Sequence, residues 1–313
     1  MKHAIRRWLP ALAALAHLCA CAPGASAPPR PPPSAGAPDA GPVPQGSVGF
    51  DGGTADRLFF ALTGDTRPGA CDATDQYPTA AITQIAASMK ALNVQFAIDL
   101  GDHMFVCNNS VQEAQQQMGF YTTAIAGGPA TWWMTMGNHE CGSAYAGSSC
   151  AVGTPDANFD SYLAALKRPR PWYSTDVQTS QGLARFVFVA DDAWNAEQAA
   201  WLEATLNDAD AHAKYTFVAR HHPVSGSRAG SDAIINAIVS HKFTLLLTAH
   251  EHTYLHDTRL YAGRTVIVGI GGGPSFAPPG FGTVEQNLDG TLTFVLRDLS
   301  GNPTGAPWAV GPQ

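Results

Sequence analysis

Polar side chains gather in the stretch MTMGNHECG, Met134 to Gly142, where a run of apolar and β-prone residues stops at a glycine. Asn138, His139 and Glu140 follow that glycine in direct succession. An amide oxygen, an imidazole and a carboxylate are groups that bind cations or move protons. A polar turn would give the same letters, so other stretches of the chain must decide between a turn and a site.

Similar residues follow four other apolar runs. They lie in TGDTRPG, with Asp65 and Arg67; in LGDHMF, with Asp102; in RHHPVSG, with His221; and in TAHEHTYLH, with His250 and His252. Each stretch alone is a weak signal, because Gly-Asp turns are common and a lone histidine is more often structural. Ligands in open α/β sheets bind at the loops that follow strands, so five such loops together predict one site.

The residue types in these loops predict metal chemistry. Oxygen ligands from Asp and Asn, combined with His nitrogens and no thiolate, suit Mn, Fe or Zn in a hydrolytic site. His250 and His252 are two residues apart, so in an extended segment both project to the same side and can reach one ion or two adjacent ions. Two ions about 3.5–4 Å apart can share a hydroxide and bind both the attacking and the leaving oxygen of a phosphoryl displacement.

Alternating strands and helices must position these loops. We expect strands over 58–63, 94–99, 131–136, 172–177, 184–190, 215–220, 243–248, 265–270 and 291–297. We expect helices over 79–91, 110–126, 158–166, 195–206 and 230–240. This alternation predicts an α/β fold with largely parallel sheet and right-handed crossovers.

The order of the loops, GD, GD, GNHE, VxxH and HxH, resembles that of the calcineurin-like metallophosphoesterases. Within that family the purple acid phosphatases are most similar, and the resemblance covers residues 58–275. It implies a four-layer αββα sandwich with two mixed β-sheets. It also implies a dinuclear metal site at one edge of the sheets.

The resemblance implies a role for each residue of the site. Asp65 and His252 would bind the first ion, Asp102 would bridge both ions, and Asn138, His221 and His250 would bind the second. His139 would place a proton on the leaving oxygen or stabilise the charged transition state. Glu140 would orient His139, or would be a surface carboxylate.

Two positions depart from the family's pattern. Arg67 stands where the family has His or Gly, and Phe105 stands where the purple group has a metal-binding Tyr. The missing ligands predict a weakly occupied first position. Arg67 either clasps a substrate phosphate or forms a salt bridge to Asp72 or Asp75. His103 is either a replacement ligand or a structural histidine.

The N-terminal part of the chain differs from the rest. Residues 1–20 combine a basic start with an apolar run too short to span a membrane, as in a signal peptide. The run ends in LCAC, which resembles a bacterial lipobox and implies a lipid on Cys21; a plainly cleaved signal peptide is the alternative. Residues 21–47 are rich in Pro and Ala and predict a disordered tether. Residues 48–313 would form the metallophosphoesterase domain.

Charge and cysteine content indicate which binding partners and which cellular compartment to expect. The 313 residues are 45% apolar and 14% charged, which fits a globular protein. Removing residues 1–20 removes three basic and no acidic residues and takes the formal charge from −7 to −10, which argues against nucleic acid as a partner. The four remaining cysteines allow three pairings. We favour Cys141–Cys150 and Cys71–Cys107 over zinc binding, because no C-x-x-C spacing is present.

Together these features predict an exported hydrolase of the bacterial cell envelope, attached to the membrane through its N-terminal lipid alone. It would hydrolyse small phosphoesters, phosphomonoesters foremost, with two Fe, Mn or Zn ions. No extra C-terminal domain like that of the family's nucleotidases is seen, which favours small substrates. A phosphodiesterase or nucleotidase is one alternative, and a non-catalytic ligand-binding lipoprotein that keeps the fold is another.

Overall fold

A computed structural model describes residues 42–142, 149–223, 231–257, 267–269 and 279–313. The expected signal peptide, Cys21 and most of the expected tether lie outside the described residues. The chain divides into two units, of which the second, residues 37–313, contains all described elements. Its first strand begins at Gly46, two residues before the expected start of the domain.

Two mixed β-sheets form the centre of this unit. The eight-stranded sheet has the order β1 (Gly46–Gly49), β2 (Gly52–Ala55), β6 (Tyr173–Thr179), β7 (Gly182–Phe188), β8 (Tyr215–Ala219), β9 (Leu245–Thr248), β11 (Ile267–Gly269), β10 (Leu255–Asp257). The six-stranded sheet has the order β14 (Trp308–Val310), β13 (Leu292–Asp298), β12 (Gly280–Gln286), β3 (Phe59–Thr63), β4 (Phe96–Asp99), β5 (Trp132–Met134). Strands β3, β4 and β5 pair in parallel, as do β7, β8 and β9.

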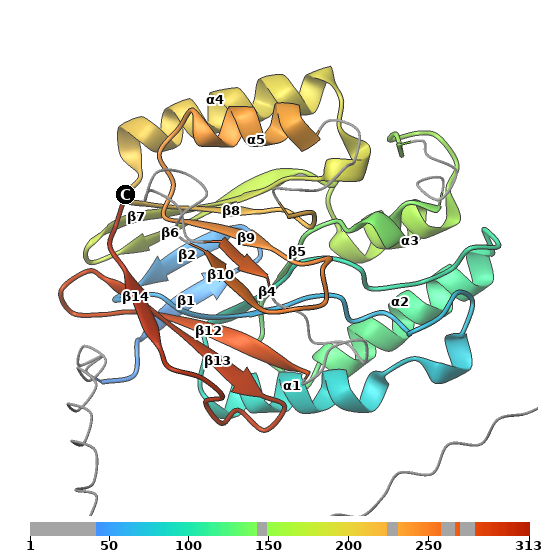
Figure 1. The fold of residues 1–313 in the computed structure, drawn as a ribbon, viewed down its shortest axis with the longest axis horizontal. Coiled ribbons are helices and arrows are strands. Elements are labelled where there is room, and N and C mark those ends of the chain that lie inside the picture. Colours follow the sequence, from blue (N-terminus) through green and yellow to red (C-terminus); the bar gives the residue numbers. More distant parts are fainter. Residues whose placement is uncertain (1–41, 143–148, 224–230, 258–266, 270–278) are drawn as a thin grey trace, which may run out of the picture. The chain divides into compact units, whose positions relative to one another are not determined.

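Helices cover the outer faces of both sheets. They are α1 (Thr79–Ala91), α2 (Val111–Ile125), α3 (Ala157–Leu166), α4 (Ala196–His212) and α5 (Ser231–Val239). Figure 1 shows α4 and α5 along one outer side and α1 and α2 along the opposite side, with the strands between them. The α/β fold with four layers and two mixed sheets is therefore confirmed. Among the described residues, no helix is long and apolar enough to cross a membrane.

Alternation along the strands explains the layers. Phe60 of β3 points between the sheets, where its ring stacks on Phe96 at 5.1 Å and meets Phe186 and Phe217 of the other sheet edge-on at 5.4 and 5.3 Å. Because successive side chains of a strand point to opposite faces, its neighbour Phe59 faces outward. Phe59 packs in a second cluster with Ile85 and Met89 of α1.

The eight-stranded sheet buries its outer face in the same way. Val187, Val218 and Leu246 pack in a cluster with apolar residues of two helices, Leu202 and Leu206 of α4 and Ile234 and Ile238 of α5. Side-chain caps fix where several helices begin. Ser110 accepts a hydrogen bond from Glu113 N at the start of α2, and Asn195 accepts one from Gln198 N at the start of α4.

Candidate metal centre

The five loops named by the sequence meet at one place. Nε2 of His221, after β8, lies 3.3 Å from Oδ1 of Asp102, after β4, and 3.9 Å from Oδ1 of Asp65, after β3. Nδ1 of His250, after β9, lies 2.9 Å from Oδ1 of Asn138, after β5. His252 completes the cluster. The structure thus brings together all six residues that the sequence proposed as metal ligands.

The backbone at the cluster is strained. Asp65, Asp102, His250 and His252 have φ values of 50°, 61°, 73° and 51°, in the left-handed region that non-glycine residues rarely adopt. Such conformations cost free energy and persist where surrounding contacts over-determine them. Here Asp65 N donates to the Gly101 carbonyl at 2.8 Å, and His250 N donates to Oδ2 of Asp65 at 2.9 Å.

The apolar run that contains β5 ends at Gly137 because a side chain would not fit at this position. A Cβ there would clash with the carboxylate of Asp102 and would lie 2.9 Å from Oε2 of Glu140. Only a residue without a side chain lets the loop after β5 approach the loop after β4. Asn138, His139 and Glu140 then form a single turn of 3₁₀-helix, η2 (Asn138–Glu140).

Glu140 is fully buried, so its interpretation as a surface carboxylate is wrong. Its Oε2 accepts hydrogen bonds from the backbone N–H groups of Asp102 and Gly137 at 2.8 and 2.6 Å. Its Oε1 accepts from His103 N at 2.6 Å. The carboxylate therefore joins the loops after β4 and β5, and it fixes the backbone on both sides of the ligands.

His103 is a structural histidine. Its Nε2 lies 3.1 Å from Oδ1 of Asp99 and its Nδ1 lies 3.3 Å from Oε1 of Glu140, and all three side chains are fully buried. Burial alone would lower the pKa of His103, but the two carboxylates raise it to about 10. An imidazolium paired on both nitrogens is not a metal ligand, so the replacement-ligand interpretation is not supported.

Among the described residues, two groups of ligand atoms that share Asp102 lie close enough to bind an ion. In each, the ligand atoms lie within 4.8 Å of one another, and Asp102 belongs to both: Asp102, His221 and His250 form one group, and Asp65, Asp102 and His252 form the other. Oδ1 of Asp65 is buried and has no hydrogen-bond partner among the described residues. Carboxylate and imidazole donors suit a divalent cation of the Mn, Fe or Zn type.

His221 is preset for binding through one nitrogen. Its Nδ1 donates to the Leu100 carbonyl at 2.8 Å, which leaves Nε2 facing the cluster. Burial would lower the pKa of His221, but Asp102 and Asp65 raise it to about 10. Burial also raises the pKa of Asp65. The buried carboxylates thus require positive charge beside them, as a metal centre would supply.

His139 lies beside the ligands. Its Nε2 is 3.5 Å from Oδ2 of Asp102, its backbone N donates to Oδ1 of Asp102 at 3.0 Å, and its ring meets Phe105 edge-on at 4.2 Å. Burial lowers the pKa of His139 to about 4 in the protein without an ion. The side chain is therefore neutral at pH 7 before substrate binds, and a neutral imidazole can donate a hydrogen bond to a phosphate oxygen.

Arg67 belongs to the same cluster. Its Nε donates to Oδ2 of Asp102 at 3.3 Å, and its Nη2 lies 3.4 Å from Nε2 of His252. The expected alternative, a salt bridge to Asp72 or Asp75, is wrong. Asp72 instead accepts a hydrogen bond from Cys107 N at 2.8 Å, because the disulfide loop turns its carboxylate toward that backbone.

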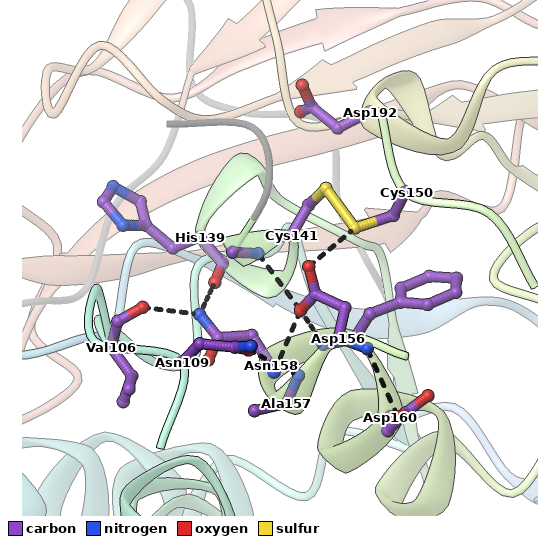
Figure 2. Close-up of a disulfide and its surroundings, with 12 residues drawn as sticks. Val106, Asn109, His139, Cys141, Cys150, Asp156, Ala157, Asn158, Asp160 and Asp192 are labelled. Carbon is purple, nitrogen blue, oxygen red and sulfur yellow. Dashed lines mark hydrogen bonds between the residues drawn. A yellow bond between two sulfur atoms is a disulfide. The ribbon is translucent and has the colours of Figure 1, made fainter. Parts of the chain in front are cut away.

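Both favoured disulfides are present, Cys71–Cys107 and Cys141–Cys150, with Cα atoms 5.8 and 5.7 Å apart. Figure 2 shows Cys141–Cys150 next to η2 and the start of α3. Asn158 of α3 donates from Nδ2 to the carbonyl oxygens of His139 and Val106 at 3.0 and 2.9 Å. This role of Asn158 was not predicted, since no local sequence pattern indicates the distant partners of a helical Asn.

Comparisons with known proteins agree with this geometry. The family model described as calcineurin-like phosphoesterase matches residues 60–254. A search among curated proteins found no match.

Three solved structures are similar in fold. Purple acid phosphatase PPD1 from yellow lupin seeds has a TM-score of 0.57 at 16% identity, over 81% of this chain and 53% of that one, so the chain spans about half the length of the lupin protein. A dimetal phosphatase from Danio rerio has a TM-score of 0.55 at 13% identity, over 82% of this chain and 99% of that one. GAP50, the anchor in the inner membrane complex of Plasmodium, has a TM-score of 0.58 at 13% identity, over 82% and 89% of the two chains.

Proposed function

The chain belongs to the calcineurin-like phosphoesterase family and is a metallophosphoesterase; from this premise we propose that it hydrolyses small phosphomonoesters. The observation that carries the proposal is the convergence of Asp102, Asn138, His221 and His250 around one point, with His139 beside it. A divalent ion bound there would lower the pKa of a bound water, so that it becomes a nucleophile at neutral pH.

The protein's own groups would bind and orient the phosphate. His139 and Arg67 both lie within 3.5 Å of Oδ2 of Asp102, on the same side of the cluster. The guanidinium can clasp two phosphate oxygens, and the imidazole can donate to the leaving oxygen or to a charged equatorial oxygen. A monoester dianion offers more negative charge to these donors than a diester does, which supports the monoesterase assignment over a phosphodiesterase.

The resemblance implied two ions, and the two groups of ligand atoms support two positions of unequal strength. Asp102, Asn138, His221 and His250 offer four donors to the second position. Asp65, Asp102 and His252 offer three donors to the first. Fe, Mn and Zn all suit these oxygen and nitrogen donors, so metal analysis of the purified protein is the measurement that decides among them.

Replacing His139 with Ala tests the catalytic proposal. We expect kcat for an aryl phosphate monoester to fall about 10²–10³-fold, because a positioned proton donor contributes on that order. Metal content should stay at the wild-type level, because His139 is not a proposed ligand. His212→Ala, an exposed histidine at the end of α4, is the matched control and should retain full activity.

Two outcomes would count against the proposal. A wild-type protein that binds no Mn, Fe or Zn and hydrolyses no phosphoester would favour the non-catalytic, ligand-binding alternative. A matched aryl diester hydrolysed faster than the monoester would favour the phosphodiesterase alternative instead.

We also propose that the protein is exported and anchored in the bacterial cell envelope through a lipid on Cys21. The signal-like residues 1–20 support this, as do the two disulfides of the domain, since disulfides persist in oxidising compartments. Wild type should partition into the detergent phase of a Triton X-114 extract, and Cys21→Ala should move to the aqueous phase. Equal partitioning of the two proteins would refute the anchor.

A further inference from the structure

Arg67 lies among the ligand atoms of the first group. Its Nε donates to Oδ2 of Asp102 at 3.3 Å and its Nη2 lies 3.4 Å from Nε2 of His252. Its Nη1 donates to the Pro68 carbonyl at 3.1 Å. Two of the three residues that would bind a first ion are therefore in contact with a guanidinium.

Neighbouring side chains fix this guanidinium. Its central carbon lies 4.5 Å from the centre of the Phe105 ring, a cation–π distance, and the side chain is only 12% exposed. The Phe105 ring offers no donor atom to a metal ion. The Phe105 ring thus stabilises the positive charge of Arg67 at the place where a first metal ion would lie.

A guanidinium and a metal ion compete for the same place. Arginine is always charged in proteins, and like charges a few ångströms apart repel strongly in a buried, low-dielectric site. Oδ2 of Asp102 and Nε2 of His252 would have to give up their Arg67 contacts to bind an ion. Asn138, His221 and His250 make no such contact, and their group remains open to an ion.

We propose that Arg67 replaces the first metal ion, so that the chain binds a single ion tightly, at Asp102, Asn138, His221 and His250. This inference rests on the proposed function and changes its metal count from two to one. The five N–H groups of a guanidinium exceed the three hydrogen bonds that Arg67 makes among the described residues, which leaves donors for a substrate phosphate. Arg67 would thereby supply a permanent positive charge for binding the substrate phosphate.

Metal stoichiometry tests the inference without reference to activity. Full-length protein is stripped with chelator, titrated with Mn²⁺, and analysed for bound metal and by electron paramagnetic resonance. We expect one ion per wild-type chain with the signal of an isolated Mn²⁺. Arg67→His removes the charge and adds a ligand, so it should bind a second ion at least about tenfold more tightly than wild type and show a spin-coupled pair.

Arg67→Lys is the matched control, because it keeps the charge without the planar fork; it should bind one ion, as wild type does. Circular dichroism checks that each variant is folded. If Arg67→His does not fold, Arg67→Ala replaces it, with the same expected gain in second-ion affinity.

Two tight ions in wild type, or no gain in second-ion affinity on removing the guanidinium, would overturn the inference. Assays of phosphomonoester hydrolysis on the same samples separate the two proposals. Two ions with hydrolysis would reject the role of Arg67 and leave the enzyme standing. No ion and no hydrolysis would reject both.

Discussion

Among single residues, Glu140 supports the geometry of the site in a way that the sequence did not predict. One buried carboxylate accepts three backbone hydrogen bonds, from Asp102, His103 and Gly137. All three donors belong to or adjoin proposed ligands, so the geometry of the metal centre depends on a residue that is not itself a proposed ligand.

Glu140→Gln is predicted to lower both stability and metal affinity. The amide keeps one acceptor oxygen and turns an N–H donor toward other N–H groups, so the free energy of unfolding should fall by about 2–4 kcal/mol. Urea denaturation measures this, and metal titration should show weaker binding. Glu113→Gln on the exposed start of α2 is the control and should change neither. A Glu140→Gln protein as stable as wild type would show that Glu140 does not hold the loops after β4 and β5 together.

The sequence indicated which residues converge at the cluster better than it indicated their hydrogen-bond partners. Asp65, Asp102 and His221 could be named because residue type and position after a strand are written in the sequence. The partners of Glu140 and Arg67 could not be named, because these contacts depend on the left-handed backbone conformations of Asp65 and Asp102. Such turns bring loops together across 38 and 35 residues of chain, beyond the reach of local patterns.

At the scale of elements, α3 supports the turn that carries His139. Oδ1 of Asp156 caps α3 by accepting from Asn158 N and Phe159 N, both at 3.1 Å. The same oxygen accepts from Gly142 N at 3.2 Å, which ties the chain after η2 to the helix. Figure 2 shows Asp156 and Asn158 beside the Cys141–Cys150 disulfide.

Asp156→Ala is predicted to lower activity as well as stability. Loss of an N-cap costs about 1 kcal/mol, and loss of the Gly142 contact should let η2 move and reduce kcat several-fold. Ser110→Ala removes the cap of α2, whose hydroxyl accepts a hydrogen bond from Glu113 N, and serves as the matched variant. Thermal denaturation and phosphatase assays should show two destabilised proteins, of which only Asp156→Ala is slower. Equal kcat values would show that α3 does not position the turn.

A buried histidine joins α4 to the segment after α5. Nδ1 of His241 lies 2.8 Å from Oδ2 of Asp210, and its Nε2 lies 3.4 Å from Oε2 of Glu203. Burial would lower the pKa of His241, but the two carboxylates raise it above its usual value of 6.5. The charged pair therefore stabilises the fold fully below about pH 6.5, and that contribution is lost as pH rises through the higher folded-state pKa.

His241→Gln should accordingly destabilise the protein more at pH 6 than at pH 9. Urea denaturation of wild type and variant at both pH values measures the difference. A difference in the free energy of unfolding between wild type and variant that grows toward pH 9 would contradict the raised pKa assigned to His241.

Helices and central strands were predicted well, while several other strands were missed. Helix α1 covers the expected 79–91, and β3, β4 and β9 lie within the expected ranges. Strands β1, β2, β10, β12 and β14 were not expected, because they are short or contain several glycines. Each has an antiparallel partner, and β2 also pairs in parallel with β6. The expectation of largely parallel sheet holds only for the central strands that alternate with helices.

At the scale of the whole molecule, the metal centre draws on both sheets. Asp65, Asp102 and Asn138 follow strands of the six-stranded sheet, and His221 and His250 follow strands of the eight-stranded sheet. Between the sheets, apolar side chains such as Phe60 and Phe217 pack together, and the hydroxyl of Tyr173 in β6 bonds to the backbone of Met134 in β5. An ion bound by both sets of loops would therefore add a link between the two sheets at their polar edge.

Metal binding should in consequence raise the thermal stability of the whole domain. A ligand that binds only the folded state stabilises it by RT ln(1 + [L]/Kd), about 2.7 kcal/mol at one hundred times Kd. For a domain of this size that corresponds to a rise in Tm of about 5–10 °C. Scanning calorimetry of chelator-treated protein with and without Mn²⁺ measures the shift, with Ca²⁺ at the same ionic strength as a control for salt.

His221→Ala separates a specific link from general ion effects. Nε2 of His221, a proposed ligand that follows a strand of the eight-stranded sheet, lies 3.3 Å from Oδ1 of Asp102 in the other sheet's loop, so its loss should remove most of the Mn²⁺-dependent rise in Tm. His212→Ala, exposed and remote from the cluster, should keep the full rise. If His221→Ala showed the same rise as wild type, the stabilising ion would lie elsewhere and the two sheets would not be joined through this centre.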